Sequence, residues 1–155
     1  MIVDSASLSE AIDARTVVTG LKADTKEEVF AELAQRLHDA GYIDSVDEFL
    51  KAIHEREAQG ATGIGEHVAI PHGRSDTVKR NGVAIAILDH EIEWESLDDT
   101  GAKVVVLFAV GADDEGSKRH LQLLSEFARK LAKADVVRDL LQATSKDQVV
   151  AALTK

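Results

Sequence analysis

The sequence predicts an α/β protein, a three-layer α/β/α sandwich with a mixed central β-sheet. Three observations lead to this fold class: capped amphipathic segments of helical periodicity, near-continuous apolar runs of strand length, and helical segments before, between and after those runs. Apolar runs without alternation are typical of strands covered on both faces, which requires helices on each side of the sheet. A chain of 155 residues is the size of one ordinary domain, so we expect a single domain over residues 1–155.

Three capping boxes mark helix starts, each a Ser or Thr followed three residues later by Glu or Gln. They begin at Thr25, Ser45 and Ser145. Apolar residues at helical spacing follow each of them. The first helix should end near Gly41, because glycine is a natural helix stop, and the second should cover 46–58.

Two more helices are predicted before Ser145, the first starting close to residues 116–119. The first is long and carries an apolar stripe at helical spacing: Leu121, Leu124, Phe127, Ala128 and Leu131. Asp135 can cap the second, which should extend to Leu140 or Leu141.

Four apolar segments predict the strands. Residues 16–19 form a short one, 83–88 and 103–110 are near-continuous, and 68–70 leads directly into Pro71. Periodicity alone also allows helices at 83–88 and 103–110, but these runs have the length of strands. Proline cannot donate to a sheet ladder, so we expect the strand 68–70 to stop at 71–73.

The composition excludes several classes of protein. Acidic residues outnumber basic ones by 28 to 18, which argues against nucleic-acid binding, since that depends on Lys and Arg releasing counterions. The acidity can reflect solubility, attraction to a basic partner or adaptation to high salt.

With no cysteine, the chain has neither disulfides nor thiolate zinc sites. No apolar run approaches the roughly 20 residues of a membrane span, and residues 1–13 lack the order of a secretory signal. We therefore expect a cytoplasmic protein with no direct membrane insertion.

The segment from Arg56 to Arg74 is the most informative for function. A helix carrying Arg56 is followed by a glycine-rich loop, a short strand and then Pro71-His72-Gly73. A lone histidine is more often a surface or core residue, but the proline and glycine here present His72 at an edge, where reactive side chains belong. Neutral imidazole is nucleophilic and titrates near physiological pH, so His72 suits the relay of a phosphoryl group.

These residues resemble a known family. Glu57, residues 64–65 and residues 68–73 are similar to the signature of the enzyme IIA domain of the bacterial phosphoenolpyruvate-dependent sugar phosphotransferase system (PTS), fructose/mannitol type, or EIIA type 2. The resemblance extends over nearly the whole chain and includes 92–94 and the histidine motif at 120–131. It implies a phosphotransferase component with a phosphohistidine intermediate.

The resemblance also implies roles for three residues. His72 matches the phosphoryl acceptor, and Arg56 and His120 match the residues that line the phosphohistidine. A guanidinium offers a planar, charged fork to phosphoryl oxygens. Two structural alternatives remain open: Arg56 in a helix-surface ion pair with a neighbouring Glu, and His120 as a buried structural histidine.

The glycine-rich loop offers further phosphoryl-binding groups. Backbone N–H groups around Gly63 and Gly65 could cradle phosphoryl oxygens, as glycine-rich nests do. Thr62 is a candidate hydroxyl donor in the same loop, and Gly73 would permit a tight turn and close approach by another molecule. No metal site is expected, because His67 and His72 would point to opposite faces of a regular strand.

The partners are expected from the resemblance. The donor would be an HPr-like phosphocarrier protein and the acceptor a cysteine of enzyme IIB, which serves the membrane enzyme IIC; no cofactor is expected. The chain has no IIB or IIC segment, so we expect a separate subunit in uptake of a sugar, with fructose favoured.

The first alternative function is a regulatory, nitrogen-type enzyme IIA that signals its phosphorylation state by binding partner proteins. The second is a metal-dependent hydrolase built on the histidines.

Overall fold

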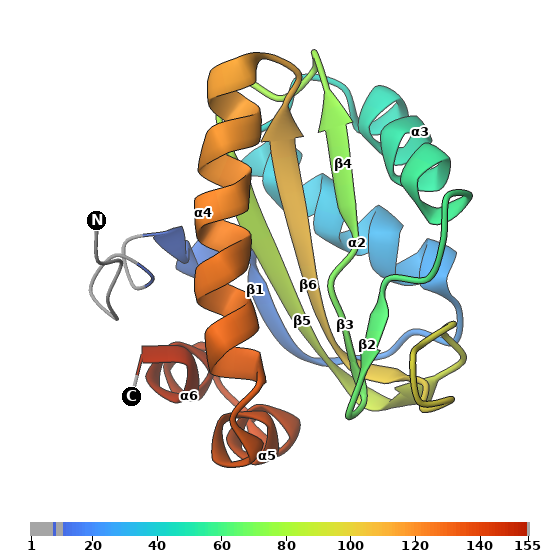
Figure 1. Ribbon diagram of the computed structural model, residues 1–155, viewed down its shortest axis with the longest axis vertical. Helices are drawn as coiled ribbons and strands as arrows, with labels where there is room; N and C mark the ends of the chain where they lie inside the picture. Colours follow the sequence, from blue (N-terminus) through green and yellow to red (C-terminus); the bar gives the residue numbers. More distant parts are fainter. Residues whose placement is uncertain (1–7, 9–10, 155) are drawn as a thin grey trace.

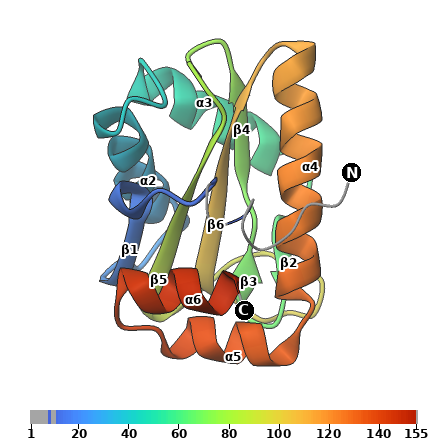
Figure 2. The ribbon, with the colours of Figure 1, turned by 90° about the vertical axis from the view of Figure 1, so that its left-hand side faces the viewer.

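The sheet is mixed and carries helices on both faces, which confirms the predicted α/β/α sandwich (Figures 1 and 2). The computed structural model describes residue 8 and residues 11–154, so most of the N-terminal segment judged not to be a secretory signal lies outside the described residues. The strand order is β1-β5-β6-β3-β2, and β4 also pairs with β6. The six strands are β1 (Val17–Leu21), β2 (Gly63–Gly65), β3 (Val68–Ala69), β4 (His72–Ser75), β5 (Gly82–Ile92) and β6 (Ala102–Gly111).

The two long apolar runs form the centre of the sheet. β5 and β6 are antiparallel; β5 is buried over 82–88 and β6 along nearly its whole length, as expected for strands covered on both faces. β1 runs parallel to β5, whereas β3 and β4 run parallel to β6. The mixed character of the sheet therefore arises from this one central antiparallel pair and the short β2–β3 hairpin.

Helices divide the core into two apolar clusters, one on each face of the sheet. The helices α2 and α3 pack on one face, and α4, α5 and α6 on the other (Figure 2). A short 3-10 helix, η1 (Ala14–Thr16), precedes β1. The helix bounds are α2 (Lys26–Asp39), α3 (Val46–Glu57), α4 (Asp114–Leu131), α5 (Ala134–Gln142) and α6 (Lys146–Thr154).

The three helix starts predicted from the capping boxes are confirmed. The hydroxyls of Thr25, Ser45 and Ser145 each accept a hydrogen bond from the backbone N–H three residues later, at 3.2 Å. The start of α5 differs from the prediction. Its N-cap is Lys133, which makes no side-chain cap bond, and Asp135 lies inside the first turn, where its charge suits the helix dipole.

The strand before Pro71 ends as expected, because β3 stops at Ala69, but a separate strand that was not predicted, β4, begins at His72. β3 and β4 lie end to end along one edge of β6, and His72 opens β4 opposite Phe108. Pro71 has no N–H, but its carbonyl accepts a hydrogen bond from the N–H of Phe108 at 3.0 Å, so pairing with β6 continues past the proline. An edge position tolerates proline because its missing N–H is not needed by a second neighbour.

Candidate functional site

His72 lies at the junction between β3 and β4, half-buried beside α4. Its ring centroid is 5.0 Å from that of His120, and His120 also packs edge-on against Phe108 at 5.2 Å. Two histidines separated by 48 positions in sequence therefore share one site. The register of β4 on β6 and the packing of α4 over β6 bring them together.

His120 projects from the second turn of α4. This helix begins at Asp114, with the carboxylate of Asp113 accepting the N–H of Gly116 at the cap. The Nδ1 atom of His120 is buried and has no hydrogen-bond partner among the described residues. Nδ1 of His120 is therefore not engaged by another residue that would compete with a group held at His72.

The surroundings keep the imidazole of His72 neutral. Burial, the neighbouring His120 and the positive charge of Arg56 together lower the pKa of His72 from 6.5 to about 4. Burial also lowers the pKa of His120. Charging either ring here would cost desolvation free energy, so at neutral pH His72 presents an unprotonated nitrogen that can act as a nucleophile.

Arg56 approaches the same site from the last turn of α3. Its Nη1 donates a hydrogen bond to the carbonyl of Gly60 at 3.1 Å. Within the described residues its guanidinium makes no ion pair, so the surface ion pair considered from the sequence is not observed. A guanidinium carries five N–H donors, and most of those of Arg56 remain available for an anionic ligand.

The glycine-rich loop does not form the expected phosphoryl cradle. The N–H of Gly63 donates to the carbonyl of Glu95 at 3.0 Å, and a Cβ at this position would lie only 2.5 Å from that oxygen. Gly65 adopts a φ of +91° and packs against the carboxylate of Asp98. Both glycines therefore serve the packing of the β2–β3 hairpin, and we no longer assign them to phosphoryl binding.

Thr62 and Gly73 also differ from the expectation. The hydroxyl of Thr62 is buried and already hydrogen-bonded on both sides, so it cannot donate to a phosphoryl oxygen. Gly73 lies inside β4 and not in a turn. A Cβ at Gly73 would come within 2.8 Å of the ring of Phe49, so close packing of α3 on β4 explains this glycine.

Sequence reasoning missed one exposed apolar side chain beside the site. Leu121 was placed in the inward stripe of α4, but its side chain is 64% exposed, and Ala128 is exposed on the same helix. The inward row instead contains His120, followed by Leu124 and Phe127. The helical period alone allows two adjacent rows of α4 to face the core, one that contains Leu121 and one that contains His120. A histidine in the second row was the feature of the sequence that could have indicated the inward face.

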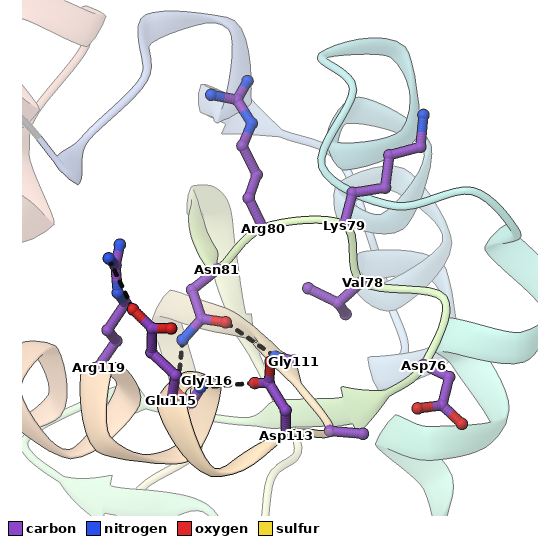
Figure 3. A pocket seen from close by; sticks show the side chains of 11 residues that line it. Asp76, Val78, Lys79, Arg80, Asn81, Gly111, Asp113, Glu115, Gly116 and Arg119 are labelled. Carbon is purple, nitrogen blue, oxygen red and sulfur yellow. Dashed lines mark hydrogen bonds and ion pairs between the residues drawn. The ribbon is translucent and has the colours of Figure 1, made fainter.

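A well-formed hollow lies at the carboxyl ends of β4 and β6, separate from His72 (Figure 3). Its volume is about 440 Å³. The amide of Asn81 bonds the N–H of Gly111 and the carbonyl of Gly116, and Arg119 pairs with Glu115. Asn81 thus holds the start of α4 and the end of β6 against the loop after β4, whereas the Arg119–Glu115 pair lies within α4, so the polar groups of this hollow serve the structure.

The described part of the chain contains neither a candidate metal cluster nor a candidate membrane helix. Over residue 8 and residues 11–154, no cluster of three or more His, Cys, Asp or Glu side chains could hold a metal ion. Over the same residues, none of the helices has the length and apolar character needed to cross a membrane.

The fold and the site define a protein that carries phosphoryl groups on histidine. The chain belongs to the family described as "Phosphoenolpyruvate-dependent sugar phosphotransferase system, EIIA 2", whose model matches residues 10–155. It is thus a PTS EIIA phosphotransferase component of the fructose/mannitol family, with a phosphohistidine intermediate.

Curated relatives support the family. The chain is 38% identical over 125 residues to the "PTS system fructose-specific EIIA component" of Haloferax volcanii, covering 81% of this chain and 80% of that protein. It is 35% identical over 130 residues to the "PTS system 2-O-alpha-mannosyl-D-glycerate-specific EIIABC component" of Escherichia coli. That match covers 83% of this chain but only 20% of the longer protein.

Solved structures support the same fold. The nitrogen regulatory protein IIA-Ntr of Neisseria meningitidis superposes with a TM-score of 0.85 at 25% identity, over 95% of this chain and 99% of that one. The mannitol enzyme IIA of Escherichia coli, in its complex with phosphorylated enzyme IIB, gives 0.78 at 27% identity, over 92% and 96% of the two chains.

Proposed function

We propose that His72 accepts a phosphoryl group from an HPr-like phosphocarrier protein and passes it to a cysteine of enzyme IIB, for uptake of a sugar of the fructose class through enzyme IIC. The observation that carries this proposal is the neutral, half-buried imidazole of His72 beside His120 and Arg56. The fructose-specific relative from Haloferax volcanii supports the sugar class, and the mannitol IIA–IIB complex supports the kind of acceptor. The proposed setting is the cytoplasm.

The residues of the site divide the work of transfer between them. The unprotonated nitrogen of His72 attacks phosphorus as the N–P bond of the donor breaks. The proton on the other ring nitrogen of His72 is released, which balances the proton taken up by the departing donor imidazole. In the second step a thiolate of enzyme IIB forms a P–S bond, and His72 regains a proton and leaves neutral.

Alignment and charge dominate such a reaction, since phosphoryl transfer passes through a loose, in-line transition state. The guanidinium of Arg56 can hold the equatorial oxygens, and the imidazole of His120, 5.0 Å from that of His72 between ring centroids, can contact them. Both groups come from elements outside β4, so they can flank His72 without blocking the path of the attacking or leaving partner.

The exposed surface beside His72 fits two protein partners that bind in turn. His72 is not enclosed in a cavity, and Leu121, the neighbour of His120, is 64% exposed. Apolar side chains that stay exposed beside a reactive group are typical of protein-docking surfaces. The acidic balance of 28 to 18 would favour a basic partner surface.

A regulatory role is the second candidate function. It is favoured by the similarity to IIA-Ntr and by a match to the "Nitrogen regulatory protein" of Klebsiella oxytoca, 36% identical over 107 residues. The phosphohistidine chemistry would be the same, but the phosphoryl group would not pass to enzyme IIB.

One reconstitution separates the two functions. The protein is incubated with phosphoenolpyruvate, enzyme I, HPr and candidate IIB proteins, and the mass of each protein is measured. We expect one acid-labile phosphoryl group on this chain, lost in His72→Ala and retained in His38→Ala, a change to an exposed histidine at the end of α2. Onward transfer to a IIB protein supports transport. Phosphorylation without transfer to any IIB protein supports regulation, and labelling that survives His72→Ala refutes the assignment of His72.

A further inference from the structure

A buried threonine joins three segments that surround the candidate site. Thr62 is only 3% exposed, and its hydroxyl donates to Oε2 of Glu57 at 2.7 Å. The hydroxyl oxygen of Thr62 also accepts a hydrogen bond from the indole N–H of Trp94 at 2.9 Å. The carbonyl of Thr62 accepts the N–H of Ile70 at 2.9 Å, two residues before His72. Thr62 thus ties the end of α3, the segment after β5 and the strand that leads to His72.

The carboxylate of Glu57 is held at a defined place by a second partner. Lys26, the first residue of α2, forms an ion pair with its other oxygen, Oε1. The ammonium of Lys26 also lies 4.9 Å from the centroid of the Trp94 ring. Only 11% of the Glu57 side chain is exposed, so its negative charge is compensated and both oxygens are bonded. Charged groups satisfied in this way have little freedom to move.

Glu57 directly follows Arg56 in the last turn of α3, and their two side chains hold the same loop. Arg56 bonds the carbonyl of Gly60, and Glu57 bonds the hydroxyl of Thr62. Loop 58–62 is therefore attached to the helix end at two points, one of which is the guanidinium that faces His72. A shift of Thr62 would move this loop and, with it, the anchor of Arg56.

We propose that Thr62, with Glu57 and Trp94, is a positioning residue for phosphoryl transfer: it fixes loop 58–62 and so holds the guanidinium of Arg56 beside His72. This inference rests on the proposed role of His72 as phosphoryl acceptor. Thr62 does not touch the phosphoryl group, and it acts through Arg56. A displacement of about 1 Å in such a group can lower a transfer rate by up to about 100-fold.

Thr62→Val tests this role, because valine keeps the shape of threonine and removes both hydroxyl hydrogen bonds. We expect the single-turnover rate of transfer from phosphorylated HPr to fall about 10- to 100-fold, with little change in the HPr concentration that gives half the maximal rate. Thr62→Ser, which restores the hydroxyl, should recover most of the rate. Trp94→Phe, which removes the indole N–H that bonds Thr62 together with part of the ring, but leaves the hydroxyl of Thr62 bonded to Glu57, should produce a smaller loss in the same direction.

Thr16→Val is the matched control. Thr16 is fully buried, its hydroxyl donates to the carbonyl of Val83 at 2.8 Å, and it lies before β1, away from loop 58–62. We expect it to lower the midpoint of thermal unfolding as Thr62→Val does, without changing the transfer rate.

The titration of His72, followed by NMR, provides a readout that needs no phosphoryl donor. Arg56 helps to lower the pKa of His72, so a displaced guanidinium should let this pKa rise in Thr62→Val and not in Thr16→Val. If Thr62→Val is less stable but keeps both the rate and the His72 titration of the unaltered protein, the positioning role is refuted. If the unaltered protein accepts no phosphoryl group, the proposed function fails, and the titration still decides whether Thr62 positions Arg56.

Discussion

Replacing Arg56 tests how the site stabilises a transferring phosphoryl group. In the free protein its guanidinium makes one exposed hydrogen bond, 3.1 Å long, to the carbonyl of Gly60. Losing that bond should reduce the free energy of unfolding by about 0.5–1.5 kcal/mol. A charge-assisted contact made mainly in the transition state contributes about 1.5–3 kcal/mol. We therefore expect Arg56→Met to slow transfer about 10- to 150-fold with only a small loss of stability.

The assay is rapid-quench measurement of transfer from phosphorylated HPr at saturating concentration. Arg56→Lys should also be slow, because lysine keeps the charge but loses the planar fork that binds two oxygens. Arg36→Met is the matched control: Arg36 lies on α2 and pairs with Glu32 at 2.8 Å, so this change removes a surface arginine from a helix that does not supply the site.

Two results would contradict the reasoning. A full rate in Arg56→Met would show that the guanidinium only fastens loop 58–62 and takes no part in transfer. An equal loss of rate in Arg36→Met would show that the effect comes from the overall charge of the protein and not from the position of Arg56.

Three further predictions concern the site and its surroundings. In an NMR titration His72 should stay neutral down to about pH 4. His90 should instead become protonated at a higher pH than an ordinary histidine, because its pKa is raised, mainly by its hydrogen bond to Asp89. Because the native pKa of His72 lies below the unfolded value of 6.5, its contribution to stability is present above pH 6.5 and is lost as the pH falls toward 4. Gly73→Ala should lower the free energy of unfolding by about 1–3 kcal/mol, since the new Cβ would press on a phenylalanine ring of α3. Leu121→Asp should weaken association with HPr in stopped-flow experiments and leave transfer within the saturated complex nearly unchanged.

Each of these predictions has a control. Protonation of His72 near pH 6.5 would show that burial does not hold the imidazole neutral. Gly111→Ala should be tolerated, because its Cβ would meet no atom closer than 3.4 Å; an equal loss of stability there would remove the packing explanation of Gly73. Leu97→Asp changes a leucine that is 81% exposed in the segment between β5 and β6, and an equal effect on HPr association would count against docking at Leu121.

Local patterns in the sequence predicted the helices and the two long central strands, but not the short strands β2 and β4. A capping box depends on side chains and backbone groups only three residues apart, so the starts at Thr25, Ser45 and Ser145 could be recognised without knowledge of the fold. The apolar runs of β5 and β6 predicted strands covered on both faces, because this pattern too lies in consecutive residues. The resemblance around His72 further identified the family.

The tertiary structure decided which groups meet at the site and which are already bonded elsewhere. The sequence contains Thr62, Gly63 and Gly65 in a loop that could hold a phosphoryl group, but it does not show that Trp94 and Glu95 come from a distant segment to bond them. It predicted the end of the strand before Pro71 but not the new strand at His72, because the partner of that strand, β6, lies more than 30 residues away in the sequence. Hydrogen-bond satisfaction and close packing depend on neighbours in space, so they are settled only when the chain is folded.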